Sequence, residues 1–98
     1  MALTATLELR LKADTLDSAF AVIHATLTAT RAFPGCLDVQ VLVDSADPAH
    51  VLVLETWESP EADNAYRQWR ATPEGASDLG SVLATAPGLI LYSVAEGV

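Results

Sequence analysis

The sequence predicts a single α+β domain of the ferredoxin-like type, in which a four-stranded antiparallel sheet carries helices on one face. Apolar and polar residues alternate over residues 3–11 and again over 36–44, as in strands that bury one side. Between these runs, apolar residues recur at helical spacing. A second helical region precedes the last apolar run at 89–94, which gives the order β-α-β-β-α-β. With 98 residues, we expect one domain over 1–98.

The first strand and the first helix have the most regular patterns. The strand has one plainly apolar side, made of Leu3, Ala5, Leu7, Leu9 and Leu11. The helix carries one apolar stripe at i, i+4, i+7 and i+11, made of Leu16, Phe20, Ile23 and Leu27. Asp14 or Thr15 can cap its start, and Pro34-Gly35 ends it.

Two further strands follow, with a turn between them. The second strand is predicted to place four residues on one face, Leu37, Val39, Val41 and Val43. The stretch SADPAH at 45–50 is predicted to make the turn, since Asp47-Pro48 is a strong turn dipeptide. The third strand then runs through Val51–Leu54 to Trp57.

The second helical region is broken in two. Ser59, Pro60 and Glu61 supply a hydroxyl cap, a first-turn proline and a first-turn acid. The helix that they start turns Ala62, Tyr66 and Trp69 inward, and Asp63 and Arg67 can pair on its exposed side. Thr72-Pro73-Glu74 repeats the start signal, and the second piece has its own stripe, made of Leu79, Val82, Leu83 and Ala86.

The third strand is apolar on both faces, because Val51–Leu54 has no polar residue between its apolar ones. Helices can cover one face only. The chain is also 51% hydrophobic and 18% charged, which is more apolar surface than a small monomer hides. We therefore expect a homodimer in which a second sheet covers the open face.

Charge and composition exclude several classes of partner. The net charge of −8 argues against nucleic acid and anionic membranes, both of which bind basic patches. No stretch approaches the roughly 20 apolar residues of a membrane span. The N-terminus lacks a signal-peptide pattern, and the one cysteine, Cys36, fits a reduced compartment, so a cytoplasmic location is expected.

With this topology, the stretch FPGCLDVQVLVDSADPAHVLVLETWESPEADNAYRQW at 33–69 resembles the antibiotic biosynthesis monooxygenase (ABM) domain family of the dimeric α+β barrel superfamily. The shared features are Pro-Gly before the second strand, an Asp-Pro turn, an apolar strand ending in Glu-x-Trp-Glu-Ser, and a helix with an aromatic residue near Tyr66. The resemblance implies a homodimer whose sheets form a barrel, with a pocket in each protomer between helices and sheet.

The resemblance also implies a choice of chemistry. Some members are cofactor-independent oxygenases of aromatic polyketides, in which the deprotonated substrate itself reduces dioxygen. Others degrade haem or act on quinols or small signalling molecules. The oxygenases use an asparagine and an arginine where this sequence has Val53 and Leu79, so their mechanism is not carried over residue by residue. The segment 73–81 holds no histidine to ligate haem iron, which argues against haem degradation.

Three residues are candidate catalytic groups, His24, Trp57 and Tyr66. His24 lies at the boundary of the first helix's apolar stripe, where a neutral imidazole can take a phenolic proton, although a surface position is the alternative. Trp57 is predicted to line the helix-side pocket and to donate its indole N–H to a substrate oxygen; it can equally be a core anchor. Tyr66 can share the cleft mouth with Arg70.

The remaining pocket candidates are Phe20, Glu55, Trp69 and Arg70. Phe20, Trp57, Tyr66 and Trp69 are expected to form aromatic walls for a flat substrate. Glu55 is a carboxylate in an apolar strand and needs a partner, for which Arg10, Lys12 or a residue across the dimer is expected; the alternative role is a general base.

No metal-ligand spacing or phosphate-binding loop occurs, so no cofactor is expected. Three functions remain open: a cofactor-independent monooxygenase of a flat phenolic, polyketide-type or quinol substrate, a cyclase or isomerase of secondary-metabolite intermediates, and a non-catalytic dimer that binds a small aromatic molecule.

Overall fold

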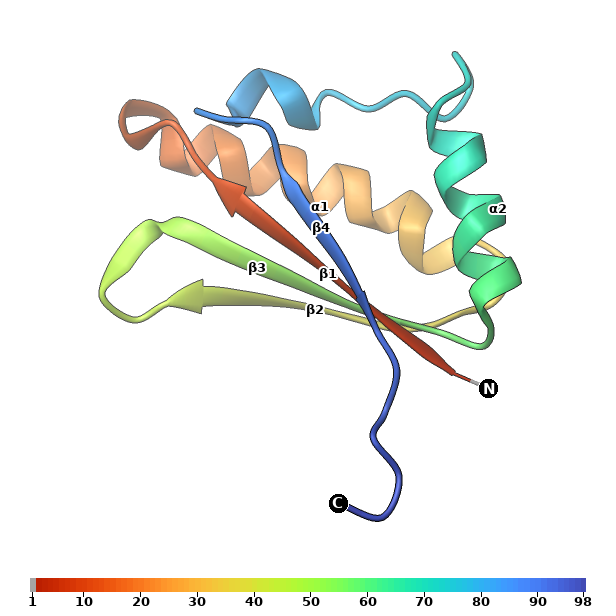
Figure 1. The fold of residues 1–98 in the computed structure, drawn as a ribbon. Coiled ribbons are helices and arrows are strands. Elements are labelled where there is room, and N and C mark those ends of the chain that lie inside the picture. Colours follow the sequence, from red (N-terminus) through yellow and green to blue (C-terminus); the bar gives the residue numbers. More distant parts are fainter. Residues whose placement is uncertain (1) are drawn as a thin grey trace.

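The computed structural model describes residues 2–98 and has the predicted element order (Figure 1). The four strands are β1 (Leu3–Arg10), β2 (Cys36–Asp44), β3 (Asp47–Trp57) and β4 (Gly88–Tyr92). The two α-helices are α1 (Leu16–Ala32) and α2 (Pro60–Arg70), and the short 3₁₀ turns are η1 (Ala13–Thr15) and η2 (Leu79–Val82). The predicted ferredoxin-like α+β fold is confirmed.

The strands form one antiparallel sheet in the order β2-β3-β1-β4, and both helices cover the same face (Figure 1). On β3, the odd-numbered residues from Val51 to Trp57 are buried under the helices. Leu52 and Leu54 point to the opposite face and are only partly covered. Trp57 therefore lies on the helix side of the sheet, as predicted.

Helix α1 packs along the sheet through one stripe. Its buried residues are Ala19, Ile23, Leu27 and Thr30, while Leu16 and Phe20 are partly buried at the edge of the same core. Helix α2 begins at Ser59, whose hydroxyl accepts a hydrogen bond from the Ala62 amide, and Pro60 takes the first helical position. Both start signals read from the sequence for α2 are thus confirmed.

The predicted second piece of the last helical region is a single 3₁₀ turn, η2. Gly75 and Gly80, with Ser77 and Asp78 between them, favour turns over a continued α-helix, so the apolar stripe predicted there does not form one helical face. Three of its residues still reach the core, Leu79, Val82 and Leu83, whereas Ala86 is exposed.

The predicted face of β2 is wrong at its first residue. The pairing with β3 shifts between Cys36 and Asp38, which is a β-bulge that leaves Leu37 unpaired and 60% exposed. Val39 and Val41 then point to the helix side as expected. The turn is also shorter than predicted: of the residues 45–50, only Ser45 and Ala46 form it, and Asp47 already belongs to β3.

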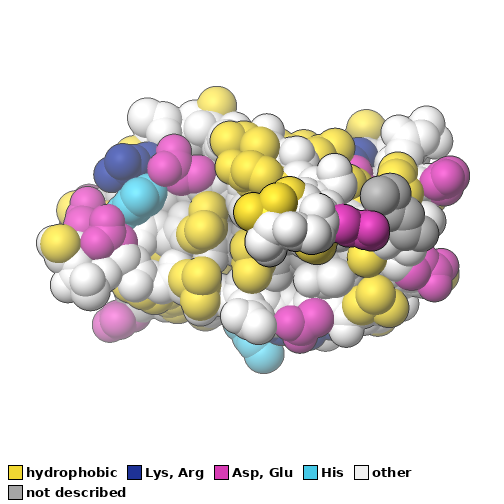
Figure 2. All heavy atoms as spheres, turned by 60° about the horizontal axis from the view of Figure 1, so that its bottom comes forward, with side chains coloured by type: hydrophobic (Ala, Val, Ile, Leu, Met, Phe, Trp, Pro, Cys, Tyr) yellow, Lys and Arg dark blue, Asp and Glu magenta, His cyan; other side chains and the backbone are white. Residues whose placement is uncertain are grey.

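The sheet face opposite the helices is open and carries apolar side chains (Figure 2). They come from β2, β3 and β4, namely Leu42, Leu52, Leu54, Ile90 and Tyr92, and β1 places the small Thr4 and Thr6 between them. Ile90 is 54% and Tyr92 48% exposed. Beyond β4, the chain leaves the sheet on this side (Figure 1), and Val94 and Val98 are exposed. None of the helices within residues 2–98 is long and apolar enough to cross a membrane.

His50 joins three strands at one end of the open face. Its Nδ1 lies 2.9 Å from Asp44 Oδ2 and its Nε2 lies 2.9 Å from Glu8 Oε2. Arg10, which pairs with Asp47 at 3.8 Å, is the nearby cation. The hydrogen bonds to Asp44 and Glu8 raise the pKa of His50, while the hydrogen bond from His50 lowers the pKa of Asp44.

We predict that His50→Gln lowers stability in acid and has a smaller effect in base. When the pKa of a histidine is higher in the folded state than in the unfolded state, the resulting stability is fully present below the unfolded-state pKa. This stability is lost as the pH rises through the folded-state pKa. The lowered pKa of Asp44 gives stability that is lost only as the pH falls below the ordinary aspartate range. Urea denaturation of wild type and variant should therefore differ more at about pH 5 than at about pH 9. An equal difference at both pH values would contradict this assignment.

Candidate functional site

A cavity of about 190 Å³ lies between the helices and the sheet, and this is the candidate site. Its apolar lining comes from the sheet, α1 and η2, namely Leu7, Leu9, Val53, Ile23, Leu27 and Leu79. Its polar lining comes from β3, both helices and the loop after α2, namely Glu55, Thr26, Tyr66, Arg67, Arg70 and Ser77. The space is thus apolar along its length, with one carboxylate and two guanidinium groups beside it.

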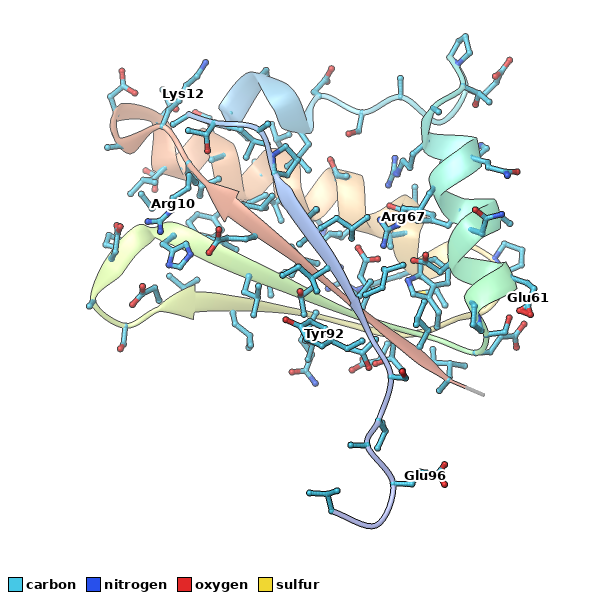
Figure 3. The ribbon with its side chains drawn as sticks, in the orientation of Figure 1. Arg10, Lys12, Glu61, Arg67, Tyr92 and Glu96 are labelled. Carbon is cyan, nitrogen blue, oxygen red and sulfur yellow. The ribbon has the colours of Figure 1, made fainter. Side chains whose placement is uncertain are left out.

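Glu55 is 1% exposed and is held by two donors. Its Oε1 accepts hydrogen bonds from the Trp57 indole Nε1 at 3.1 Å and from Arg67 Nη2 at 2.6 Å. The same guanidinium contacts Asp63 Oδ1 at 3.0 Å, and Figure 3 shows Arg67 reaching from α2 toward the sheet. A buried carboxylate needs such partners, because its charge is poorly solvated inside the protein.

Of the two ion pairs predicted from the sequence, the one to Glu55 is corrected and the one between Asp63 and Arg67 is confirmed. Glu55 does not pair with Arg10 or Lys12: Arg10 points to the open face and contacts Asp47, and Lys12 donates to the Ser81 carbonyl. The reason is strand parity, since Glu55 shares the helix side with its cross-strand neighbours. The Asp63–Arg67 pair forms as predicted, but Asp63 is buried rather than exposed.

Tyr66 and Arg70 form a second polar group with α1. The Tyr66 hydroxyl lies 2.6 Å from Thr30 Oγ1 and accepts a hydrogen bond from Arg70 Nε at 2.7 Å. Arg70 also donates to the carbonyl oxygens of Thr26 at 2.8 Å and Gly75 at 3.1 Å. Tyr66 and Arg70 are therefore brought together at the cavity, as the sequence suggested, and they tie α2 to α1.

The aromatic cluster differs in one member from the predicted one. Trp57 and Tyr66 lie 4.9 Å apart between ring centroids, and Trp69 lies 6.2 Å from Tyr66. Phe33, not Phe20, completes the cluster, at 5.3 Å from Tyr66 and 5.5 Å from Trp69. Phe20 packs against the main apolar core. The sequence could have indicated this role of Phe33 by its position directly before Pro34-Gly35, where the end of α1 meets the start of α2.

Trp57 is fully buried beneath this cluster and is absent from the lining of the cavity. It acts on the site through Glu55, to which its indole N–H donates. Trp57 is therefore a buried core residue, which is the second of the two roles that the sequence left open. Trp69 likewise lies outside the inner cavity, at a second one described below.

His24 lies on the exposed side of α1 and outside the cavity lining, which corrects the predicted position at the cleft edge. The helix turns about 100° per residue, so a residue that follows the buried Ile23 points well away from the sheet. Thr26 and Leu27 reach the cavity instead. His24 therefore cannot reach a molecule inside this cavity directly.

Within the part of the chain that the structure describes, no three His, Cys, Asp or Glu side chains come together as metal ligands. Glu55 and Asp63 both contact the Arg67 guanidinium instead.

Comparison with known proteins gives one family and many similar folds. The family model described as antibiotic biosynthesis monooxygenase matches residues 2–77. A putative antibiotic biosynthesis monooxygenase from Deinococcus radiodurans is 23% identical, with all of this chain and 96% of that chain covered and a TM-score of 0.78. A mutant of SnoaB, a cofactor-independent oxygenase from Streptomyces nogalater, is 14% identical, with 99% and 96% covered and a TM-score of 0.80. No curated protein matches the chain.

We predict that Arg67→Met destabilises the fold by roughly 3 kcal/mol, because it leaves the buried carboxylates of Glu55 and Asp63 without a counter-charge. Arg10→Met is the matched control: its 3.8 Å pair with Asp47 is exposed and should cost less than about 1 kcal/mol. Chemical denaturation measures both. Similar losses in the two variants would show that the buried pair is not a main source of stability.

Proposed function

Because the chain belongs to the antibiotic biosynthesis monooxygenase family, we propose that it is a cofactor-independent monooxygenase of a small, flat phenol or quinol. The observation that carries the proposal is a buried carboxylate, Glu55, in the wall of a cavity whose other lining is half apolar and includes two arginines. The cavity of about 190 Å³ is slightly larger than the ~150 Å³ apolar cavities that bind benzene. It suits one ring or two fused rings.

Glu55 is the general base in this proposal. Its Oε1 is engaged by Trp57 and Arg67, whereas its Oε2 has no hydrogen-bond partner in residues 2–98. That oxygen is free to accept the proton of a substrate hydroxyl. Arg67 supplies a fixed positive charge beside the negative charge that builds up on the substrate oxygen. Because Arg67 is itself held by Asp63, these groups are in place before the substrate arrives.

The substrate supplies the electrons of the reaction. Loss of the hydroxyl proton to Glu55 gives a phenolate, whose electron density rises at the ring carbon opposite the oxygen. That carbon forms a bond to dioxygen and loses its proton, and the O–O bond then breaks. One oxygen atom remains as a quinone carbonyl and the other leaves as water, so a phenol and dioxygen give a quinone and water.

A second function is favoured by two residues of the wall. Val53 and Leu79 occupy the places of the asparagine and arginine expected from the oxygenases, and both line the cavity. A cyclase or isomerase needs a shaped cavity and one base, without groups that stabilise reduced oxygen. The oxygen requirement of turnover separates the two functions.

We expect purified protein to convert 1-naphthol to a quinone in air and not under nitrogen. Glu55→Gln should lower kcat by about 10²- to 10⁴-fold while naphthol still binds, since the amide keeps the shape but cannot take the proton. Glu61→Gln, on the outward side of α2 (Figure 3), is the matched control and should keep full activity. Turnover that is unchanged in Glu55→Gln removes Glu55 as the base, and turnover without oxygen selects the isomerase class.

We also propose that the protein is a homodimer joined through the open sheet face. The support is the apolar surface of that face and the chain beyond β4, which leaves the sheet on the same side. Ile90 and Tyr92 are large side chains of which about half is still exposed, and burying the exposed half of Ile90 contributes roughly 1 kcal/mol. A second copy offers the same apolar surface and needs no other partner.

The dimer can be tested by charge insertion. Ile90→Glu places a carboxylate on the open face and should convert the dimer to a monomer of about 10 kDa in multi-angle light scattering. Ala65→Glu, on the exposed side of α2, is the control and should leave the mass unchanged. A wild-type monomer at micromolar concentration would contradict the proposal.

A further inference from the structure

A second, larger space lies beside the candidate site. It is a groove of about 540 Å³ between α1, the end of α2 and the loop 74–78. Its floor is formed by the small residues Ala21, Ala25 and Ala29 of α1, and Trp69 forms one wall. We call it the outer groove, and the cavity that contains Glu55 the inner cavity.

Three residues line both spaces, namely Thr26, Arg70 and Ser77. The inner cavity is otherwise walled mainly by buried side chains such as Leu9 and Val53, whereas the outer groove is walled mainly by exposed ones. The two spaces are thus adjacent, and Arg70 has the only long side chain of the three that separate them.

Arg70 is fixed in this position by four hydrogen bonds. Its guanidinium donates to the Tyr66 hydroxyl, the Gly75 carbonyl, the Thr26 carbonyl and Thr30 Oγ1, over 2.7–3.1 Å. The same group lies 4.9 Å from the centroid of the Trp69 ring. Gly75 is held just as closely, because a Cβ there would overlap the Trp69 carbonyl. The partition is therefore rigid on both sides.

We propose that Arg70 limits the length of the substrate by closing the inner cavity against the outer groove. This inference rests on the proposed function. With Arg70 in place, the space beside Glu55 is below the ~300–1,000 Å³ of ordinary ligand pockets, and joining it to the outer groove brings it within that range. Arg70 is thus a specificity residue that selects one- and two-ring phenols over longer fused-ring systems.

The outer groove has surfaces that a third ring can use once the partition is removed. A flat ring can lie on the alanine floor of α1 and against the Trp69 indole. Glu74 and Asp78 at its rim are acceptors for hydroxyl groups and repel anionic substituents. The longer molecules admitted by an opened site are therefore neutral, hydroxylated ring systems.

The test compares two probes, 1-naphthol with two fused rings and 1-anthrol with three, by titration calorimetry. Wild type should bind 1-naphthol at least about tenfold more tightly than 1-anthrol, as expected when a closed wall excludes a ring. Arg70→Ala should bring the two affinities to within about threefold of each other. Arg70→Gln keeps a hydrogen-bond donor for the polar groups around it and should change the affinity ratio less, in the same direction. This second variant keeps the test valid if Arg70→Ala does not fold.

A filling variant identifies where the third ring goes. Arg70→Ala with Ala25→Trp places an indole in the outer groove and should abolish the gain in 1-anthrol binding. Arg70→Ala with Ala65→Trp, on the outer side of α2, is the matched control and should keep the gain.

Each outcome has a distinct meaning. Wild type that binds neither phenol removes the proposed function, and this inference with it. If wild type binds 1-naphthol and both Arg70 variants keep the wild-type ratio of 1-naphthol to 1-anthrol affinity, the role of Arg70 is overturned. The proposed function is then unaffected. Wild type that binds 1-anthrol as tightly as 1-naphthol also overturns the role of Arg70.

Discussion

The buried ion pair between Glu55 and Arg67 is the interaction on which the site depends. A carboxylate that is 1% exposed is costly unless it has a partner of opposite charge, and here one guanidinium contacts both Glu55 and the neighbouring Asp63. The pair also joins β3 to the centre of α2. Arg67 is thus one of the contacts that hold α2 against the sheet beside the inner cavity.

The polar groups of the site form two separate hydrogen-bonded systems with different roles. The system of Trp57, Glu55 and Arg67 orients a charge at the cavity wall. The system of Thr30, Tyr66 and Arg70 fixes the two helices to each other. Tyr66 lies between the two guanidinium groups, each about 5 Å from its ring. Such contacts between cations and an aromatic face stabilise this region, and no fully buried side-chain nitrogen or oxygen atom of the described residues lacks a hydrogen-bond partner.

Periodicity predicted most of the fold, and it placed Trp57 and Glu55 on one face of the third strand and Tyr66 on the inward side of α2. Periodicity failed at the bulge, where the extra residue Leu37 changes the strand register. An alternating pattern of apolar and polar residues does not reveal where a β-bulge inserts a residue. It also failed to name the partner of Glu55. A strand pattern gives the face of a residue, whereas the partner depends on how far a side chain from another element extends. Phe33 was missed for a related reason, since it follows the last turn of α1 and belongs to no stripe.

The bulge in β2 has a further consequence for behaviour at high concentration. Strands β2 and β4 are the two edges of the sheet, and each edge presents free backbone donors and acceptors to other chains. Edge β2 is interrupted by the bulge and carries Asp38 and Asp44, and edge β4 is only five residues long. Both features oppose edge-to-edge pairing, which leads to fibrils. The sheet therefore discourages open-ended growth at its edges while its face remains apolar.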